Sequence, residues 1–342
     1  MSSFSSAVSP NATIVRPPFF FLSGFSEIPH VKYYYIFMCF VYAVTVLGNS
    51  FIMLIIYMDR SLHTPKYVIV FHLALVDMFG STALIPKFID TFLFDNQFIA
   101  FEACLVNMLF VQCFTFMQSL TLVVLAYDRF IAICFLLKYH IIITNVAMVV
   151  ILAVLWTLTA GLGIVAVAFL SRLSFCKSVV INSYYCDYGP MYRLACNNNS
   201  ANYIISMIAI TMLLVVPLVL IVATYGCIIF ALLKIASAEE QLRAIKTCTS
   251  HFIVVALFYL PICAIYIAGN VTIVHPNVRI ISTSLSCTIA PMLNPIIYTL
   301  KTEEIIKEIK KLFKRVKVQI WTLTLLRHTS GLSHVQNFAT MS

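Results

Sequence analysis

Charged side chains are scarce in this chain. Of its 342 residues only 10% are charged, whereas 61% are hydrophobic. A soluble globular domain carries about 25% charged residues, so this scarcity excludes an ordinary soluble protein. The mean hydropathy of +0.97 indicates a chain whose apolar surface belongs in lipid.

The sequence signatures of catalysis are also absent. The chain has no Gly-rich phosphate loop, no His-Glu-x-x-His pair and no nucleophile elbow, and its eight histidines are scattered. We therefore expect neither an enzyme nor a metal centre. No Lys lies between Arg279 and Lys301, so a retinal-binding protein is disfavoured.

Long apolar stretches predict an all-α membrane protein, because about 20 apolar residues span a bilayer as a helix. Seven stretches qualify: Tyr34 to Tyr57, Tyr67 to Phe92, Ala103 to Ile133, Ala147 to Leu170, Ile204 to Leu232, Phe252 to Val274 and Ile280 to Leu300. We expect a tail over 1–32, a seven-transmembrane helix bundle over 33–301, an amphipathic eighth helix over 302–318 and a second tail over 319–342.

The basic residues predict the orientation of this bundle. With the N-terminus outside, about two-thirds of the 22 Lys and Arg residues fall on the inner side. This asymmetry is what the positive-inside rule expects of a membrane protein. A nucleic-acid-binding surface is the poorer interpretation, because the basic residues flank apolar spans.

Cysteines and glycosylation sequons agree with this orientation. Four cysteines are predicted outside, where oxidising conditions favour disulfides, although residues alone allow three pairings. They are Cys104, Cys176, Cys186 and Cys196. Sequons at Asn11 and Asn198 lie on the same side.

Four polar residues inside the spans are candidate functional groups. Asp77 is the ionisable one, and polar groups in lipid are functional candidates by default. With Asn49, Gln118 and Asn294 it would form a cluster that holds a sodium ion or a proton. The alternative is a structural hydrogen-bond network.

Asp128 and Arg129 lie where the third span meets polar sequence, which suggests a gate. Groups at similar depth on other spans would complete two alternative packings. These groups are Lys66, Tyr225, His251 and Tyr298. The alternative is that Arg129 only anchors the helix at the inner boundary. The break at Asn294-Pro295 predicts a hinge.

The outer half of the third span predicts a small-molecule pocket. Gln112, Thr115, Phe116 and Ser119 share one helical face. The sixth span has the same spacing at Tyr259, Ile262, Cys263 and Tyr266. Mostly apolar walls with a few polar groups suit such a pocket, although aromatic stripes also serve plain helix packing.

After the last span, an apolar face alternates with lysines. Ile305 and Ile309 lie on the apolar face, and Lys307, Lys310 and Lys311 lie on the others. A basic amphipathic helix of this kind lies in the membrane interface and is attracted to anionic lipid.

Six segments make the chain resemble a known family. They are Gly48-Asn49, Leu62-His63-Thr64-Pro65-Lys66-Tyr67, Leu73-Ala74-Leu75-Val76-Asp77, Tyr127-Asp128-Arg129, Lys246-Thr247-Cys248-Thr249-Ser250-His251 and Pro291-Met292-Leu293-Asn294-Pro295-Ile296-Ile297-Tyr298. Together they resemble the rhodopsin-like G-protein-coupled receptors, and within them the odorant receptors, particularly the fish-type branch.

The resemblance implies specific roles. It implies disulfides from Cys104 to Cys186 and from Cys176 to Cys196. It places Arg129, Tyr225 and Tyr298 in the activation switch, and it implies coupling through a stimulatory G protein to cAMP. The implied odorant pocket comprises Val111, Gln112, Thr115, Phe116, Ala209, Leu213, Tyr259, Ile262, Cys263 and Tyr266. Val111 stands where amine receptors carry Asp, so an amine ligand held by that pair is disfavoured.

Several positions depart from the commonest odorant-receptor pattern. Lys66 stands where Met is usual, and Leu260 where Gly is usual. Other departures are Phe130, Thr224 and Lys246. Two alternatives stay open: a non-olfactory receptor for a lipid, nucleotide or peptide, and a seven-helix transporter or channel using Asp77.

Overall fold

The computed structural model describes residues 14–25, 30–234, 237–271, 275–301, 304–311 and 314. The predicted sequon at Asn11 and the tail over 319–342 lie outside this part of the chain. The side chains of Tyr266 and Tyr298 lie outside it as well.

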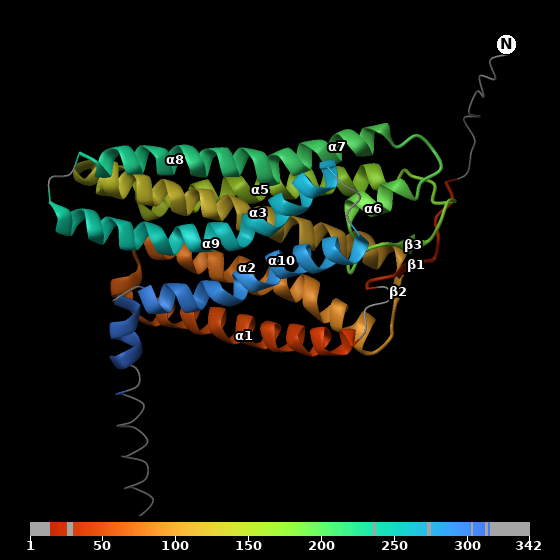
Figure 1. The fold of residues 1–342 in the computed structure, drawn as a ribbon, viewed down its shortest axis with the longest axis horizontal. Coiled ribbons are helices and arrows are strands. Elements are labelled where there is room, and N and C mark those ends of the chain that lie inside the picture. The colour runs from red at the N-terminus through yellow and green to blue at the C-terminus, as the bar shows by residue number, and fades with distance from the viewer. Residues whose placement is uncertain are drawn as a thin grey trace, which may run out of the picture.

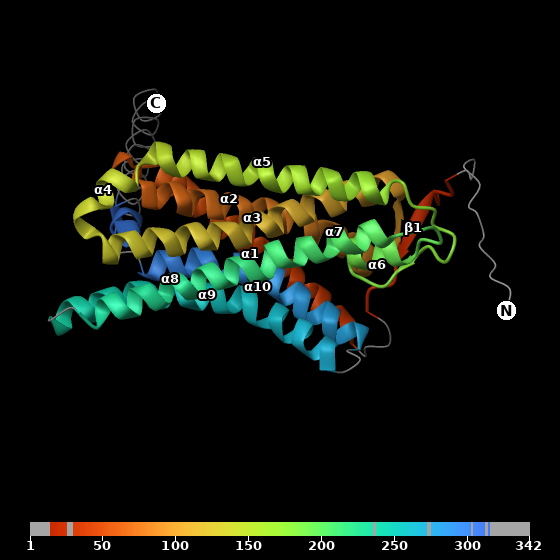
Figure 2. The ribbon, with the colours of Figure 1, turned by 90° about the horizontal axis from the view of Figure 1, so that it is seen from above.

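Long helices packed side by side make up the fold, with the last two inclined to the others (Figures 1 and 2). They are α1 (Val31–Met58), α2 (Pro65–Leu93), α3 (Phe101–Cys134), α5 (Asn145–Leu170), α7 (Ser200–Ile210), α8 (Val216–Leu232), α9 (Ala238–Val271) and α10 (Pro276–Lys301). In the described residues, seven helical stretches are long and apolar enough to cross a membrane. The predicted seven-helix bundle is therefore confirmed.

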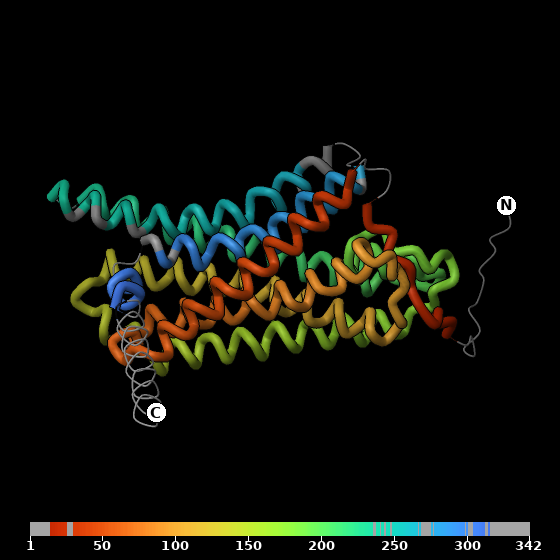
Figure 3. The backbone as a smooth tube through the Cα atoms, turned by 90° about the horizontal axis from the view of Figure 1, so that it is seen from below, coloured from red at the N-terminus to blue at the C-terminus, as the bar shows by residue number. Residues whose placement is uncertain are grey.

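Helix α3 lies at the centre of the bundle in both views (Figures 1 and 2). Its most apolar window is 61% buried inside the protein, compared with 22% for α5, which faces outward along most of its length. Figure 3 shows α1 running obliquely across the bundle, where it packs against α2 and α10. Interior contacts are therefore concentrated on α3.

One close helix contact requires a glycine. A Cβ atom on Gly48 of α1 would meet the ring of Pro295 on α10, with its Cγ at 2.9 Å. Small residues allow membrane helices to approach in this way, since their backbones then pack directly. α10 runs without interruption through both Pro291 and Pro295.

The fifth span contains a π-helical turn. α7 continues into η3 (Thr211–Val215), and α8 follows with Pro217 near its start. A π turn inserts one extra residue and loosens the regular bonding. Here the Leu213 carbonyl accepts a hydrogen bond of 2.8 Å from the Ser119 hydroxyl of α3. The sequence predicts one unbroken span over Ile204 to Leu232, so the turn is a feature it did not reveal.

A three-stranded sheet covers one end of the bundle, which we call the sheet end; we call the opposite end the Arg129 end. Its strands are β1 (Phe19–Leu22), β2 (Phe98–Ala100) and β3 (Val180–Ile181), with β1 in the middle. Phe20 and Leu22 are fully buried, and Phe20 packs edge-on against Phe175. The segment predicted as a tail over 1–32 therefore contributes to the folded core.

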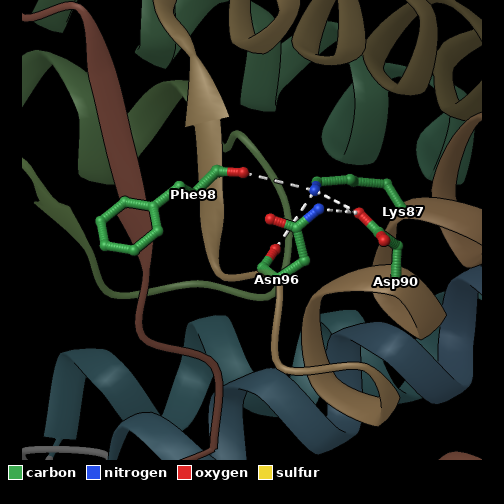
Figure 4. A network of polar contacts seen from close by, with 4 residues as sticks. All are labelled: Lys87, Asp90, Asn96 and Phe98. Carbon is green, nitrogen blue, oxygen red and sulfur yellow. Dashed lines mark hydrogen bonds and ion pairs between the residues drawn. The ribbon is translucent and has the colours of Figure 1, made fainter.

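Polar contacts hold β2 in place beside α2 (Figure 4). The Lys87 ammonium donates to the Asp90 carboxylate at 2.6 Å and to the carbonyls of Asn96 and Phe98. The Asn96 amide donates to the same carboxylate at 3.0 Å. This network fixes the turn from α2 into β2.

Short elements complete the chain. At the Arg129 end these are η1 (Arg60–Leu62), η2 (Leu136–Lys138) and α4 (Tyr139–Ile142), and at the sheet end α6 (Tyr188–Arg193). Residues 304–311 are helical. The interfacial role of this segment stays a prediction.

Two disulfides fasten the sheet end. Cys104, at the start of α3, is joined to Cys186, and Cys176 is joined to Cys196. These are the pairs that the resemblance implies. Cys104 and Cys186 are both fully buried, so the first bridge anchors the long loop after α5 to the centre of the bundle.

We predict that Cys104→Ser abolishes delivery to the cell surface. Removing a native disulfide typically costs about 2–5 kcal/mol, and here it also releases the loop that carries β3. Surface antibody labelling of an N-terminal tag measures the effect, with the free thiol Cys39 changed to Ser as the control. Surface levels of Cys104→Ser equal to those of the control would contradict this prediction.

Candidate functional site

The Arg129 end contains a buried, ion-paired carboxylate. Arg129 Nη1 lies 3.9 Å from Asp128 Oδ2, and the two side chains are only 14% and 1% exposed. The Tyr139 hydroxyl donates to the other Asp128 oxygen at 2.8 Å. Within the described part of the chain, Arg129 Nε has no hydrogen-bond partner. Asp128 thus holds Arg129 by an ion pair, and the Nε–H group of Arg129 remains available as a hydrogen-bond donor.

Tyr139 is a member of this site that sequence reasoning missed. It lies on α4, outside every predicted span, and it reaches Asp128 from the loop after α3. Burial raises the pKa of Tyr139, and the neighbouring Asp128 carboxylate raises it further, so the phenol stays protonated and can donate.

Tyr225 and His251 form a second link near the same end. The Tyr225 hydroxyl lies 2.7 Å from His251 Nδ1, and the two rings stack with centroids 5.9 Å apart. The other ring nitrogen of His251 lies 3.1 Å from the Leu122 carbonyl of α3. Together these contacts connect α8, α9 and α3.

Three of the four predicted cluster residues meet in the middle of the bundle. The amides of Gln118 and Asn294 donate to the two Asp77 oxygens at 2.9 and 2.6 Å. The amide of the fourth, Asn49, donates to the carbonyls of Thr45 and Pro291 and so bonds α1 to α10. Its membership of the cluster stays a prediction.

A small cavity adjoins Asp77. Its lining includes Asp77, Ser81, Gln118 and Cys287, together with Val111 and Thr115 of the predicted pocket, and it has room for about one water molecule. Among the described residues, Ser81 Oγ and Asn294 Oδ1 are buried without a hydrogen-bond partner. Oxygen atoms with free lone pairs beside a carboxylate suit a hard cation.

The residues predicted to line the ligand pocket come from α3, α7, η3 and α9. Val111, Phe116, Tyr259 and Ile262 are buried, whereas Gln112, Thr115, Ala209, Leu213 and Cys263 are partly buried. Of the pocket residues whose side chains are described, none carries a formal charge. Gln112 Oε1 is buried and has no hydrogen-bond partner in the described part of the chain.

Ser119 connects this region across helices. Its hydroxyl lies 2.6 Å from the Tyr259 hydroxyl of α9 and donates to the Leu213 carbonyl of η3. The helical spacing predicted that Ser119 lies on the pocket face. Its partner, the Leu213 carbonyl in the π turn, could not be predicted from the sequence.

Exposed apolar side chains lie on one connection at the Arg129 end. Leu137 is 98% exposed, and Leu136 and Ile141 are also exposed, all in the loop between α3 and α5. The sequence analysis did not single out these residues, although Leu136 and Leu137 are adjacent leucines outside every predicted span.

Comparison with known proteins identifies the family. The sequence pattern of the olfactory receptor family matches residues 38–316. The chain belongs to the olfactory receptor family. This receptor is 35% identical to olfactory receptor 51F2 of Homo sapiens over 90% of each chain. It is also 35% identical to olfactory receptor 1M1 of Mus musculus, over 86% of this chain and 95% of the relative.

Membership of this family, whose proteins are receptors rather than enzymes, defines the general function. The receptor is an odorant receptor and a multi-pass protein of the plasma membrane, and the family implies odorant ligands and coupling to a G protein. Olfactory receptor 1 of Rattus norvegicus, 32% identical over 91% of this chain and 98% of its own, agrees with this assignment.

We predict that Tyr139→Phe raises ligand-independent signalling. The substitution removes a hydrogen bond to the charged Asp128, a bond worth about 1.5–3 kcal/mol, and so weakens the packing that holds Arg129. Basal cAMP at matched surface expression measures it, with the exposed Tyr127 changed to Phe as the control. Equal basal cAMP in both variants would show that the Tyr139 bond does not restrain the receptor.

Proposed function

We propose that a small organic odorant binds between α3, the α7–η3 region and α9, and shifts the receptor toward a state that admits a stimulatory G protein at the Arg129 end. The observation that carries this proposal is that two hydrogen bonds join α3 to α9. Ser119 meets Tyr259 in the pocket region, and Leu122 meets His251 nearer Arg129. A ligand that binds one arrangement of these helices better than the other shifts the population between them.

The predicted pocket side chains support a neutral, mostly apolar ligand. They carry no formal charge where the structure describes them, and a charged ligand would lose its hydration without gaining a counter-ion. The orphaned Gln112 oxygen favours a ligand that carries one hydrogen-bond donor, such as a hydroxyl group.

The proposed orientation has the sheet end outside the cell. Both disulfides and the sequon residue Asn198 support it, because disulfides form in oxidising compartments. The excess of basic residues at the opposite end supports it too. The proposed membrane-lipid contact of residues 304–311 belongs to that inner side, and membership of the fish-type branch remains part of the proposal.

The principal experiment is a cAMP assay in cells expressing the receptor with a stimulatory olfactory G protein. A panel of neutral volatile and water-soluble molecules is screened, with Arg129→Ala as the control. We expect a concentration-dependent rise in cAMP that Arg129→Ala abolishes at unchanged surface expression, because Arg129 would face the G protein. Signalling that persists in Arg129→Ala would refute the proposed gate.

A sodium ion is the proposed occupant of the Asp77 site, held by oxygens of Asp77, Ser81 and Asn294. Its bound charge would stabilise the ionised carboxylate inside the bundle. We expect the apparent melting temperature of the purified receptor to rise when NaCl replaces choline chloride at constant ionic strength, since a ligand of the native state stabilises it. Asp77→Asn should remove this rise, and an equal rise in Asp77→Asn would place sodium elsewhere.

A further inference from the structure

Two ion pairs join the first inner loop to the helical segment 304–311. Lys66, at the start of α2, places its Nζ 4.0 Å from Glu304 Oε2. Asp59, just after α1, places its Oδ2 3.7 Å from Lys311 Nζ. Glu304 and Lys311 are the two ends of the described segment, about 10 Å apart along a helix.

The two ion pairs have opposite polarity along the segment. The α1–α2 connection supplies a cation to one end of the segment and an anion to the other. A segment reversed or shifted by a few residues would place like charges together. The backbone at Glu304 lowers the pKa of the Glu304 carboxyl, and Asp59 accepts a hydrogen bond of 2.8 Å from the backbone N–H of Ser61, so both contacts favour the anionic carboxylate.

An apolar contact lies between the two pairs. Ile305 is 1% exposed and belongs to a buried cluster with Ile55, Ile56 and Leu62, and Ile309 packs against the same cluster. The segment, which follows α10 at the end opposite the sheet in Figure 1, is therefore seated by its apolar face. The Lys66–Glu304 pair then favours the orientation in which it is seated, and Lys311 contacts both Asp59 at 3.7 Å and Glu308 of its own segment at 3.2 Å.

Lys66 also belongs to the surroundings of Arg129. Its ammonium group interacts electrostatically with Arg129, Glu304 and Asp128. Its side chain is 27% exposed, so solvent screens these interactions only in part. An uncharged side chain of similar length, such as Met, would interact electrostatically with neither Glu304 nor Asp128.

We propose that Lys66 is a positioning residue that ties the 304–311 segment to α2 beside Arg129, and so sets the surface on which the G protein docks. This inference rests on the proposed coupling at the Arg129 end. Losing the tie lowers the efficiency of coupling and leaves the ligand pocket unchanged, because the pair lies at the opposite end of the bundle from the sheet.

The experiment compares charge reversals in the full-length receptor. The variants are Lys66→Glu, Glu304→Lys, the double variant that exchanges both charges, and Lys66→Met. Lys310→Glu is the matched control, because Lys310 is exposed on the same segment and the change of charge is equal. Surface expression is measured for every variant.

Amide hydrogen exchange of residues 304–311 in lipid nanodiscs measures the seating directly, without ligand or G protein. We expect each reversal to speed exchange about two- to threefold, the size of effect that a partly exposed ion pair supports. The double variant should return close to the wild-type rate. Because Glu304→Lys also puts a cation near the start of a helix, the informative comparison is between Glu304→Lys and the double variant.

Basal and odorant-panel cAMP at matched surface levels measures the consequence for coupling. We expect the two single reversals to lower it about two- to threefold and the exchange of charges to restore it. Failure of the double variant to recover either readout would overturn the proposal. So would an equal loss in Lys310→Glu, since a general attraction of the segment to anionic lipid would then explain the effect.

The two proposals fail in different ways. A wild-type receptor that produces no cAMP with any member of the panel, while exchange follows the charge pattern, refutes the proposed coupling and leaves the seating of the segment established. Exchange that follows the charge pattern while cAMP is unaffected in all variants overturns the positioning role of Lys66.

Discussion

The absence of water in the hydrocarbon core is the constraint on which the rest of this structure depends. A polar group there must find its partner within the protein, because an unsatisfied one costs several kcal/mol. The backbone meets this requirement by forming helices. The polar side chains meet it by bonding across helices, as Asn49 does to the Pro291 carbonyl and Ser119 to the Leu213 carbonyl. Each such bond fixes the relative position of two helices.

This requirement makes α3 the common partner of the bundle. Gln118 bonds to Asp77 on α2, Ser119 bonds to η3 and meets Tyr259 on α9, and the Leu122 carbonyl meets His251. These residues follow one another along one helix between the pocket region and Arg129. A change in how α9 packs therefore alters its contacts with α3 at Ser119 and at Leu122, the second of which is one turn closer to Arg129.

The sequence predicted what depends on composition and helical period, and missed what depends on contacts between distant segments. The seven spans followed from apolar length, and the grouping of Asp77 with Asn294, and of Tyr225 with His251 near Arg129, followed from polar residues at matching depth. The bond from the Asn49 amide to the Pro291 carbonyl was not predicted, because depth alone does not say which way an amide turns. Tyr139, the π turn at Thr211–Val215 and the strand β1 could not be predicted, since each depends on a tertiary partner or a local backbone irregularity.

The order of the strands in the sheet sets the order in which the protein can be assembled. β1 is synthesised near the start of the chain, yet its neighbour β3 follows only after α1, α2, α3 and α5. Phe20 and Leu22 therefore cannot be fully enclosed until most of the membrane helices have been made. Cys186 follows β3 closely in the chain and is joined to Cys104, so the disulfide closes the same region covalently. Completion of the sheet end therefore has to wait until the first four membrane-spanning helices have been made, and it precedes the synthesis of the last three spans.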